Sequence, residues 1–264
     1  MTIRKILFPL TATVAGEAAL ATALMIANRW NAHLMALHVQ VKSGGRAHVA
    51  RSMFEQAAAR QNVPVQEAQT ERAYASASFA SVTGREEEVV AQQARLADLT
   101  VMSHPNVAED MSSSAALQAV LFDSGRPVMI APPLAPRSVG DRVCIAWNGT
   151  AESAESVLSA IPWMQRANAV RILSAEGYQR SGPSASELLP YLALHGIHAE
   201  IVMFRSVRFS AGAGLMRAAR LFGCDLLSMG AYSHSRFRQL VLGGVTQHFL
   251  ENSGLPDFPV MMTR

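Results

Sequence analysis

The sequence contains an internal repeat with a period of about 130 residues. The run from Asp98 to Ser103 (Asp-Leu-Thr-Val-Met-Ser) matches the run from Asp225 to Gly230 (Asp-Leu-Leu-Ser-Met-Gly). Two further matched pairs, in the same order along each half, are Ser124–Pro127 with Ser253–Pro256 and Lys5–Leu7 with Arg142–Cys144. A repeat of this period predicts two copies of one domain, joined head to tail.

Within each copy, short apolar runs alternate with longer segments of helical periodicity. Each apolar run has the length and composition of a buried strand. Strands that alternate with helices form parallel sheets with helices on both faces. The predicted fold class is therefore α/β, with two tandem doubly wound parallel-sheet domains of the Rossmann-like type. The segment Ala73–Val82 is rich in small residues and ambiguous, and only part of it is predicted as a strand.

A proline-rich segment separates the two copies. The run from Pro132 to Pro136 contains three prolines, which fix φ and lack an amide N–H, so it cannot continue a helix or a central strand. The predicted boundaries are 1–133 for the N-terminal domain, 134–140 for the linker and 141–264 for the C-terminal domain.

Composition argues against several classes of protein. Of the 264 residues, 50% are apolar and 16% are charged, so the chain can bury a large core and is not of the disordered class. The net charge is only +3 and the basic residues are scattered, so no nucleic-acid groove is predicted. The 2 cysteines lack a metal-binding spacing and fit a reducing compartment. No signal pattern and no apolar run of the ~18 residues that span a bilayer is found, so a cytoplasmic protein without membrane contact is expected.

The segment from Asp225 to Arg264 carries the strongest pattern for a ligand site. An apolar run ends at Gly230, a polar loop follows, and a helical pattern begins after the pair Gly243-Gly244. Glycines let backbone N–H groups approach an anion, and the first N–H groups of a helix have no partner within the helix. This order is typical of a phosphate cradle. The alternative is that Gly230 only ends the strand and the glycine pair only allows close packing, and spacing alone does not separate the two.

This segment resembles the C-terminal motif of the universal stress protein family. In that motif a strand ends in Gly, a second Gly follows after two residues, and a third Gly, followed by Ser or Thr, comes after nine more. Here the four places hold Gly230, Ser233, Gly243 and Gly244, so the second and the last depart from the ATP-binding form. The resemblance covers the whole chain and implies an adenine-nucleotide alpha-hydrolase-like fold. It also implies pairing of the two domains within one chain, and a homodimer as a further expectation.

The resemblance implies the rest of a candidate nucleotide site at the carboxyl ends of the strands, near the topological switch point. Where the family usually has Asp-Gly-Ser, this chain has Asn148-Gly149-Thr150, which keeps hydrogen bonding and loses the charge. Asn148 and Ser174 are expected near the ribose and base, although Asn148-Gly149 is also simply a good turn. The candidate ligand is ATP with Mg²⁺, and the candidate residues are Asn148, Gly149, Ser174, Gly230, Ser233, Gly243 and Gly244.

The corresponding places in the N-terminal copy lack the glycines. Thr11 stands where the acid would be, Ser103 stands where Gly230 does, and Ser114-Ala115 stand where the glycine pair does. Close approach of an anion to the backbone is harder without glycine. The N-terminal domain is therefore expected to have a degenerate site and to serve mainly as a structural partner.

Three other patterns favour structural explanations. The run Ser210–Gly214 is glycine-rich but opens a helix, which favours close packing. His195 and His198 fall in a helix-to-strand turn and are better explained as solvated side chains than as a metal pair. The run Ser233–Ser235 contains His234 but has no acid at a recognisable triad spacing. No catalytic or metal-binding residue is predicted.

Three functions remain in order of preference. The first is a tandem universal stress protein of the stress response that binds ATP through its C-terminal domain and is at most a weak ATPase, because no general base or carboxylate pair is evident. The second is a nucleotide-free interaction or scaffold protein of the same fold. The third is an adenylate-forming enzyme, ranked last because neither Leu10–Thr13 nor Trp147–Thr150 supplies the Ser-Gly-Gly-x-Asp-Ser type of loop.

Overall fold

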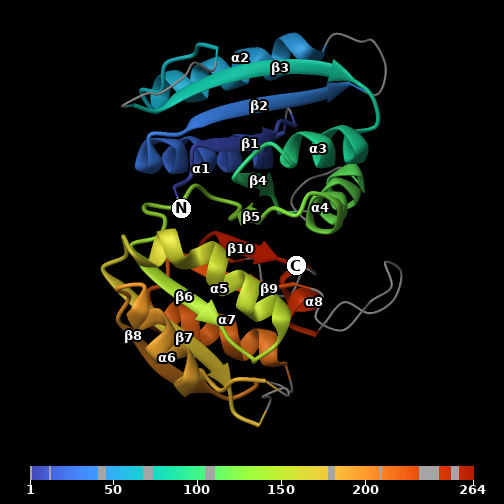
Figure 1. The fold of residues 1–264 in the computed structure, drawn as a ribbon. Helices are drawn as coiled ribbons and strands as arrows, with labels where there is room; N and C mark the ends of the chain where they lie inside the picture. The colour runs from blue at the N-terminus through green and yellow to red at the C-terminus, as the bar shows by residue number, and fades with distance from the viewer. Residues whose placement is uncertain are drawn as a thin grey trace. The chain divides into compact units, whose positions relative to one another are not determined.

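The chain divides into two compact units, Thr2–Arg137 and Ser138–Arg264. The structure is a computed structural model that describes residues 2–11, 13–40, 46–67, 74–104, 111–177, 182–207, 210–231, 244–250 and 256–264. Figure 1 colours the first unit from blue to green and the second from yellow-green to red. The division follows directly after the proline-rich segment 132–136.

The N-terminal unit alternates strands and helices along its length. Its elements are β1 (Lys5–Pro9), α1 (Val14–Trp30), β2 (His33–Gln40), α2 (Arg46–Arg60), β3 (Ser76–Thr83), α3 (Glu86–Ala94), β4 (Leu99–Ser103), α4 (Met111–Asp123) and β5 (Val128–Ala131). The strands are parallel and lie in the order β3-β2-β1-β4-β5. Right-handed crossovers place α1 and α2 on one face and α3 and α4 on the other. The two helices of each pair are in contact (Figure 1).

The C-terminal unit repeats this topology. Its elements are β6 (Arg142–Ala146), α5 (Ala151–Met164), β7 (Ala169–Ala175), α6 (Ala185–Leu194), β8 (Ala199–Phe204), α7 (Ala211–Phe222), β9 (Leu226–Gly230), α8 (Gly244–Leu250) and β10 (Val260–Thr263). The parallel order is β8-β7-β6-β9-β10, which equals the N-terminal order strand for strand. Helix α5 packs on β6, β9 and β10 (Figure 1). The predicted fold class, two doubly wound parallel α/β sheets, is confirmed.

The central strands are apolar on both faces because helices cover both sides of each sheet. In β1, Ile6, Leu7 and Phe8 are all fully buried. Sulfur-containing side chains of both units are buried as well, namely Met102, Met129, Met229, Met261, Met262, Cys144 and Cys224. The core thus follows directly from the apolar runs in the sequence.

A carboxylate holds the first and fourth strands of the N-terminal unit in register. Asp98, just before β4, accepts hydrogen bonds through Oδ2 from the backbone N–H groups of Arg4 (2.8 Å) and Lys5 (3.0 Å). Its own backbone N–H donates to the carbonyl of Lys5 at 2.9 Å. The acid therefore binds the amino end of β1 to the amino end of β4.

Asp225 makes the same contact in the C-terminal unit and extends it. Its carboxylate accepts hydrogen bonds from the N–H groups of Gly140 (3.1 Å), Asp141 (3.0 Å) and Arg142 (2.8 Å), and from the hydroxyl of Ser138 (2.6 Å). Its backbone N–H donates to the carbonyl of Arg142 at 3.0 Å. Hydrogen bonds to a charged acceptor are stronger than neutral ones. Residues 138–141, which follow the prolines, are thereby tied to this unit.

The segment predicted with least clarity, Ala73–Val82, contains all but the last residue of the edge strand β3. Its burial falls from the first residues to the exposed end at Thr83. The outer edge of β3 is covered in part, because Ala77 donates to the carbonyl of Pro64 at 3.0 Å and accepts from Gln66 at 2.8 Å. Its mixed burial explains why the sequence shows neither a continuous apolar run nor a clean alternation.

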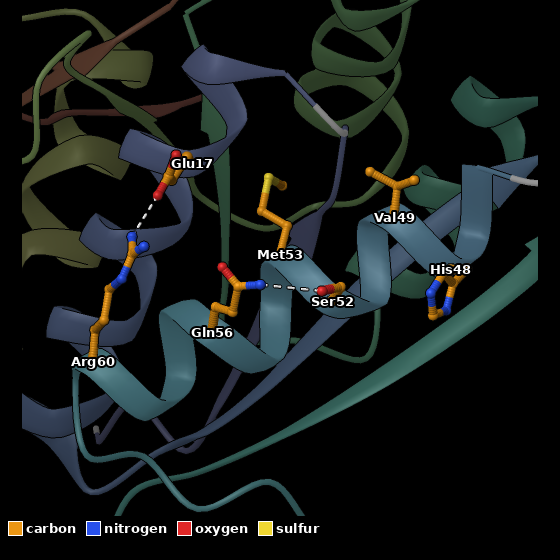
Figure 2. Close-up of a pocket in the computed structure, with 7 residues that line it drawn as sticks. All are labelled: Glu17, His48, Val49, Ser52, Met53, Gln56 and Arg60. Atoms are coloured by element: carbon orange, nitrogen blue, oxygen red, sulfur yellow. Dashed lines mark hydrogen bonds and ion pairs between the residues drawn. The ribbon is translucent and has the colours of Figure 1, made fainter.

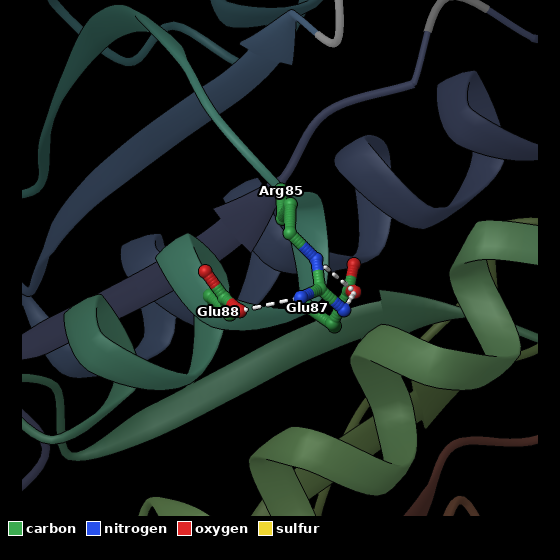
Figure 3. Close-up of polar contacts among 3 residues, drawn as sticks. All are labelled: Arg85, Glu87 and Glu88. Atoms are coloured by element: carbon green, nitrogen blue, oxygen red, sulfur yellow. Dashed lines mark hydrogen bonds and ion pairs between the residues drawn. The ribbon is translucent and has the colours of Figure 1, made fainter.

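The first turn of α3 shows how local charge selects a helix start. Arg85 precedes the helix without a side-chain cap, and its guanidinium bonds Glu87 at 2.7 Å and Glu88 at 2.9 Å (Figure 3). A hydrogen bond from its own backbone N–H, and then the bond from Arg85, lower the pKa of Glu87. The acids also suit the positive end of the helix dipole. Because the Arg85 side chain is 70% exposed, these pairs orient the turn and contribute little stability.

The Asp225→Asn substitution tests the contact between the first and fourth strands. An amide N–H₂ would replace one acceptor and face backbone donors, so we expect the free energy of unfolding of the C-terminal unit to fall by about 3 kcal/mol. The measurement is urea unfolding followed by the fluorescence of Trp147 and Trp163, which both lie in this unit. The control is Asp257→Asn, which removes the charge of an acid 67% exposed and paired with Arg220 at 2.9 Å, and should cost less than about 1 kcal/mol. Equal effects of the two changes would contradict this role of Asp225.

Candidate functional site

The topology defines where a ligand would bind in the C-terminal unit. Strand β6 lies between β7 and β9, and the chain leaves β6 toward β7 but returns to β9 on the other side. The switch point is therefore at the carboxyl ends of β6 and β9, where ligands of open α/β sheets bind. The described part of this edge consists of the loop 147–150 after β6, the end of β7 and the end of β9.

The structure brings part of the predicted residue set to this edge. Asn148 and Gly149 lie in the loop after β6, and Gly230 is the last residue of β9. Gly244 is the first residue of α8, as the helical pattern predicted to within one residue. Ser233 and Gly243 lie outside the described residues, as do the nearby His234, Arg236 and Arg238.

The loop after β6 is organised by the side chain of Asn148. Its Oδ1 accepts hydrogen bonds from the backbone N–H of Thr150 at 3.2 Å and from the Thr150 hydroxyl at 2.9 Å. The Thr150 hydroxyl in turn caps α5 by accepting from the N–H of Ser153 at 3.3 Å. Thr150 is thus the N-cap of α5. The loop is also a good turn, as the alternative explanation held, with Gly149 at a φ of +82°.

The loops after β6 and β7 are bound to each other, which the sequence analysis did not anticipate. The indole Nε1 of Trp147 donates to the carbonyl of Pro183 at 2.9 Å. Gly182 lies directly against Gly149, and a Cβ on Gly182 would overlap the carbonyl oxygen of Gly149. The sequence signal was the Gly-Pro dipeptide 182–183, placed just before the capping box of Ser184 and Glu187.

Ser174 lies at the end of β7 and is only 4% exposed. It pairs with Met203 of β8, and the backbone N–H of Trp147 donates to the carbonyl of the preceding residue, Leu173, at 2.9 Å. A ligand would reach the Ser174 hydroxyl only after the covering atoms move. Its contact with a base therefore stays a prediction.

Gly230 is explained by packing in this structure. A Cβ at this position would lie 2.5 Å from the backbone carbon of Glu152 and 2.7 Å from the N of Ser153, in the first turn of α5. One side-chain hydrogen bond links β9 to α5, and a second lies within α5. The Ser228 hydroxyl donates to the carbonyl of Ser156 at 3.0 Å, and the Ser156 hydroxyl donates to the carbonyl of Ser153 at 2.8 Å. A glycine at the end of β9 is required whether or not a ligand binds.

The glycine-rich run 210–214 is also explained by packing, as predicted. Ser210 caps α7 by accepting from the N–H of Ala213 at 3.2 Å. A Cβ on Gly212 would lie 2.6 Å from the Cβ of His248, so α8 packs directly on α7 at this point. Burial, and then the guanidinium of Arg220, lower the pKa of His248. The neutral imidazole therefore stabilises the fold above the unfolded-state pKa of about 6.5, and this contribution is lost as the pH falls through the lower folded-state pKa.

The corresponding edge of the N-terminal unit differs in its side chains. The hydroxyls of Thr11 and Thr13 are 3.3 Å apart, and Thr13 caps α1 by accepting from the N–H of Gly16 at 3.1 Å. His38 of β2 contacts the carbonyl of Leu10 through Nδ1 at 3.1 Å. Ser103 ends β4 with a side chain where β9 ends in glycine. This unit has the same loops with a different set of polar groups.

The N-terminal unit also has a groove of about 400 Å³ between α1 and α2 (Figure 2). Its lining comprises Glu17, His48, Val49, Ser52, Met53, Gln56 and Arg60. Two hydrogen bonds join residues of this lining to each other. Arg60 bonds Glu17 at 2.6 Å, and Gln56 donates to Ser52 at 3.2 Å. All lining residues belong to the two helices, and none comes from the loops at the switch point.

Two predicted absences can be compared with the described part of the chain. Among those residues, no three His, Cys, Asp or Glu side chains gather closely enough to hold a metal ion. His195 packs edge-on against Tyr191, with ring centroids 4.9 Å apart, and His198 is exposed. No helix within the same residues has the length and apolar character required to cross a membrane.

Comparison with known proteins identifies the fold. No protein-family model matches the sequence, and no curated protein matches it. A universal stress protein from Archaeoglobus fulgidus superposes with a TM-score of 0.66 at 12% identity, covering 98% of this chain and 98% of that chain. A Pseudomonas aeruginosa protein of unknown function gives a TM-score of 0.64 at 16% identity, covering 99% of this chain and 92% of that chain. The chain therefore has the fold of a universal stress protein over nearly its whole length, and the resemblance stated from the sequence is confirmed at the level of the fold.

The Gly230→Ala substitution tests the packing explanation of this glycine. The added Cβ overlaps the backbone of α5, so we expect a loss of about 2 kcal/mol in the free energy of unfolding without any ligand present. The control is Gly177→Ala, where the φ of +68° opposes a side chain but nothing lies within 4 Å, with an expected cost of about 1 kcal/mol. Urea unfolding measures both. A Gly230→Ala protein as stable as the wild type would show that packing does not require this glycine.

Proposed function

We propose that this chain is a tandem universal stress-type protein of the stress response whose C-terminal unit binds an adenine nucleotide, with ATP as the candidate. The observation that supports it best is the difference between the two switch points of one repeated fold. The C-terminal edge presents the amide of Asn148 beside a strand that ends in Gly230. The N-terminal edge presents paired threonine hydroxyls and the side chain of Ser103.

The chemistry of the C-terminal edge fits an anionic ligand. A segment of polar sequence separates β9 from α8, which begins at Gly244. In the proposal, backbone N–H groups at Gly230, Ser233, Gly243 and Gly244 bind the phosphates, because glycine permits close approach and a backbone N–H carries no competing charge. Asn148 and Ser174 contact the ribose and base. The N-terminal unit serves as a structural partner.

The proposal assigns no catalytic residue. The described groups at the edge are hydroxyls, amides, backbone groups and two carboxylates, Glu152 in the first turn of α5 and Glu176 directly after β7, of which Glu176 is paired with Arg205 at 2.7 Å. In the proposal none of them activates water. Weak hydrolysis of ATP is the most that such a site would support.

A second function, a nucleotide-free scaffold of the same fold, is favoured by one specific observation. Gly230 and Gly212 both lie where a Cβ would overlap a neighbouring helix. Gly230 belongs to the predicted phosphate cradle, whereas Gly212 was assigned to packing from the sequence. Packing therefore explains the glycine at the end of β9 without a ligand, and this glycine does not distinguish binding from scaffolding.

Calorimetric titration of the purified chain with ATP and Mg²⁺ distinguishes the two functions. We expect one ATP per chain and loss of binding in Gly243→Val, because a branched side chain blocks backbone approach. The matched control is Ser114→Val, at the corresponding place in the N-terminal unit, which should bind ATP as the wild type does. No heat at millimolar ATP, once carried-over nucleotide has been excluded, would favour the scaffold. Two ATP per chain would show that the N-terminal unit also binds.

A further inference from the structure

Strand β8 has one edge that no described residue pairs with. It is the outer strand beside β7, and Figure 1 shows it at the margin of the C-terminal unit. The carbonyl of Phe204 accepts from the N–H of Glu176 at 2.8 Å, so the backbone groups of Phe204 point toward β7. Because these groups alternate along a strand, those of Ala199, Ile201 and Met203 point away from β7. Within the described part of the chain, these outward groups have no hydrogen-bond partner.

The corresponding strand of the N-terminal unit has its outer edge covered. Ala77 of β3 bonds Pro64 and Gln66 through its backbone, and the first three residues of β3 are buried. No residue of β8 is fully buried, and Met203 is 51% exposed. Proteins commonly protect a free edge with Lys, Pro or a covering segment. The sequence of β8, Ala-Glu-Ile-Val-Met-Phe, contains neither Lys nor Pro. The edge is therefore suited to accept a further strand.

Opposite charges lie at the two ends of this edge. Glu200, near the amino end, is 73% exposed and bonds Arg171 at 3.1 Å. Arg205, directly after the carboxyl end, is 85% exposed and bonds Glu176 at 2.7 Å. A two-fold axis through the middle of β8 would exchange the two ends, so Glu200 of each copy would lie close to Arg205 of the other. The edge is thus complementary to itself in antiparallel pairing.

Helix α7 adds an exposed apolar side chain beside this edge. A Cβ on Gly214 would lie 2.4 Å from the carbonyl oxygen of Arg205 and 3.0 Å from the ring of Phe204, so this side of α7 lies against β8. Leu221 is about two turns further along the same side of the helix and is 78% exposed. Together with Met203, it supplies apolar area that backbone pairing alone would lack.

We propose that β8 is a homodimer interface, at which two copies of this chain pair their β8 strands antiparallel about a two-fold axis. A register centred on Val202 keeps most of β8 paired and places Glu200 beside Arg205 of the second copy. In this register, Ile201 and Met203 of opposite copies exchange backbone hydrogen bonds. A register centred on Glu200 would instead place two carboxylates opposite each other, which is destabilising.

The test is the dissociation constant of the dimer, measured by sedimentation velocity over a concentration series without nucleotide. Met203→Pro removes an outward N–H and leaves the bonds to β7 in place, because proline is tolerated on an edge strand. We expect the wild type to form a dimer, and Met203→Pro to raise the dissociation constant at least about tenfold, since two symmetry-related hydrogen bonds are lost. The matched control, Met203→Ala, keeps the N–H and should change the constant about threefold or less.

A second set of variants leaves the backbone intact. Glu200→Arg and Arg205→Glu should each weaken the dimer about threefold or more, because each places like charges across the interface. The double variant should bind more tightly than either single variant. Urea unfolding verifies that each variant is folded.

Three results would each overturn the inference. The first is a wild-type chain that stays monomeric at the highest concentration measured. The second is a dimer that Met203→Pro and Met203→Ala weaken equally or not at all. The third is a double charge variant whose dimer is weaker than that of both single variants.

Discussion

Two carboxylates, Asp98 and Asp225, fix the strand pair on which each unit depends. The carboxylate of each acid accepts hydrogen bonds from backbone N–H groups at the amino end of the first strand. The backbone N–H of each acid donates to a carbonyl of that strand. The chain between the paired strands runs through three crossover helices and two further strands, so these contacts close a long loop. With the first and fourth strands in register, their carboxyl ends meet at the switch point. The location of the candidate site follows from contacts at the opposite edge of the sheet.

The duplicated fold carries two switch points that have diverged. In the C-terminal unit, the Ser228 hydroxyl of β9 bonds the Ser156 carbonyl of α5, and the first turn of α5 lies where a Cβ at position 230 would be. In the N-terminal unit, Gly16 instead lies against the carbonyl of Thr11, and β4 ends in Ser103. In each unit, glycine thus occupies a position where the first turn of a helix packs closely against the end of a strand or the loop after it. Packing and ligand binding act on the same backbone positions, and a glycine motif is weak support for a ligand by itself.

Much of the fold could be predicted from the sequence, because the apolar runs of a doubly covered parallel sheet are continuous and the repeat shows each of them twice. The apolar run that ends at Gly230 is the strand β9, which ends at the same residue in the structure. The edge strand β3 was predicted least well, since its residues are only partly buried. For the site, the sequence identified the loop at Asn148, but not the orientation of its amide or the contact of Gly182 with Gly149. Those features depend on chain segments that meet only after the sheet has formed, and no local pattern encodes them.

The central claim is that the C-terminal switch point of this repeated fold binds the nucleotide and its N-terminal counterpart does not. Amide hydrogen–deuterium exchange with and without saturating ATP tests it most directly, because both switch points are observed in one experiment. The account predicts slower exchange with ATP in peptides that cover residues 147–150 and 226–250, and unchanged exchange in peptides that cover residues 8–16 and 99–104. Equal protection of the two switch points would contradict the account, and so would protection confined to α1 and α2.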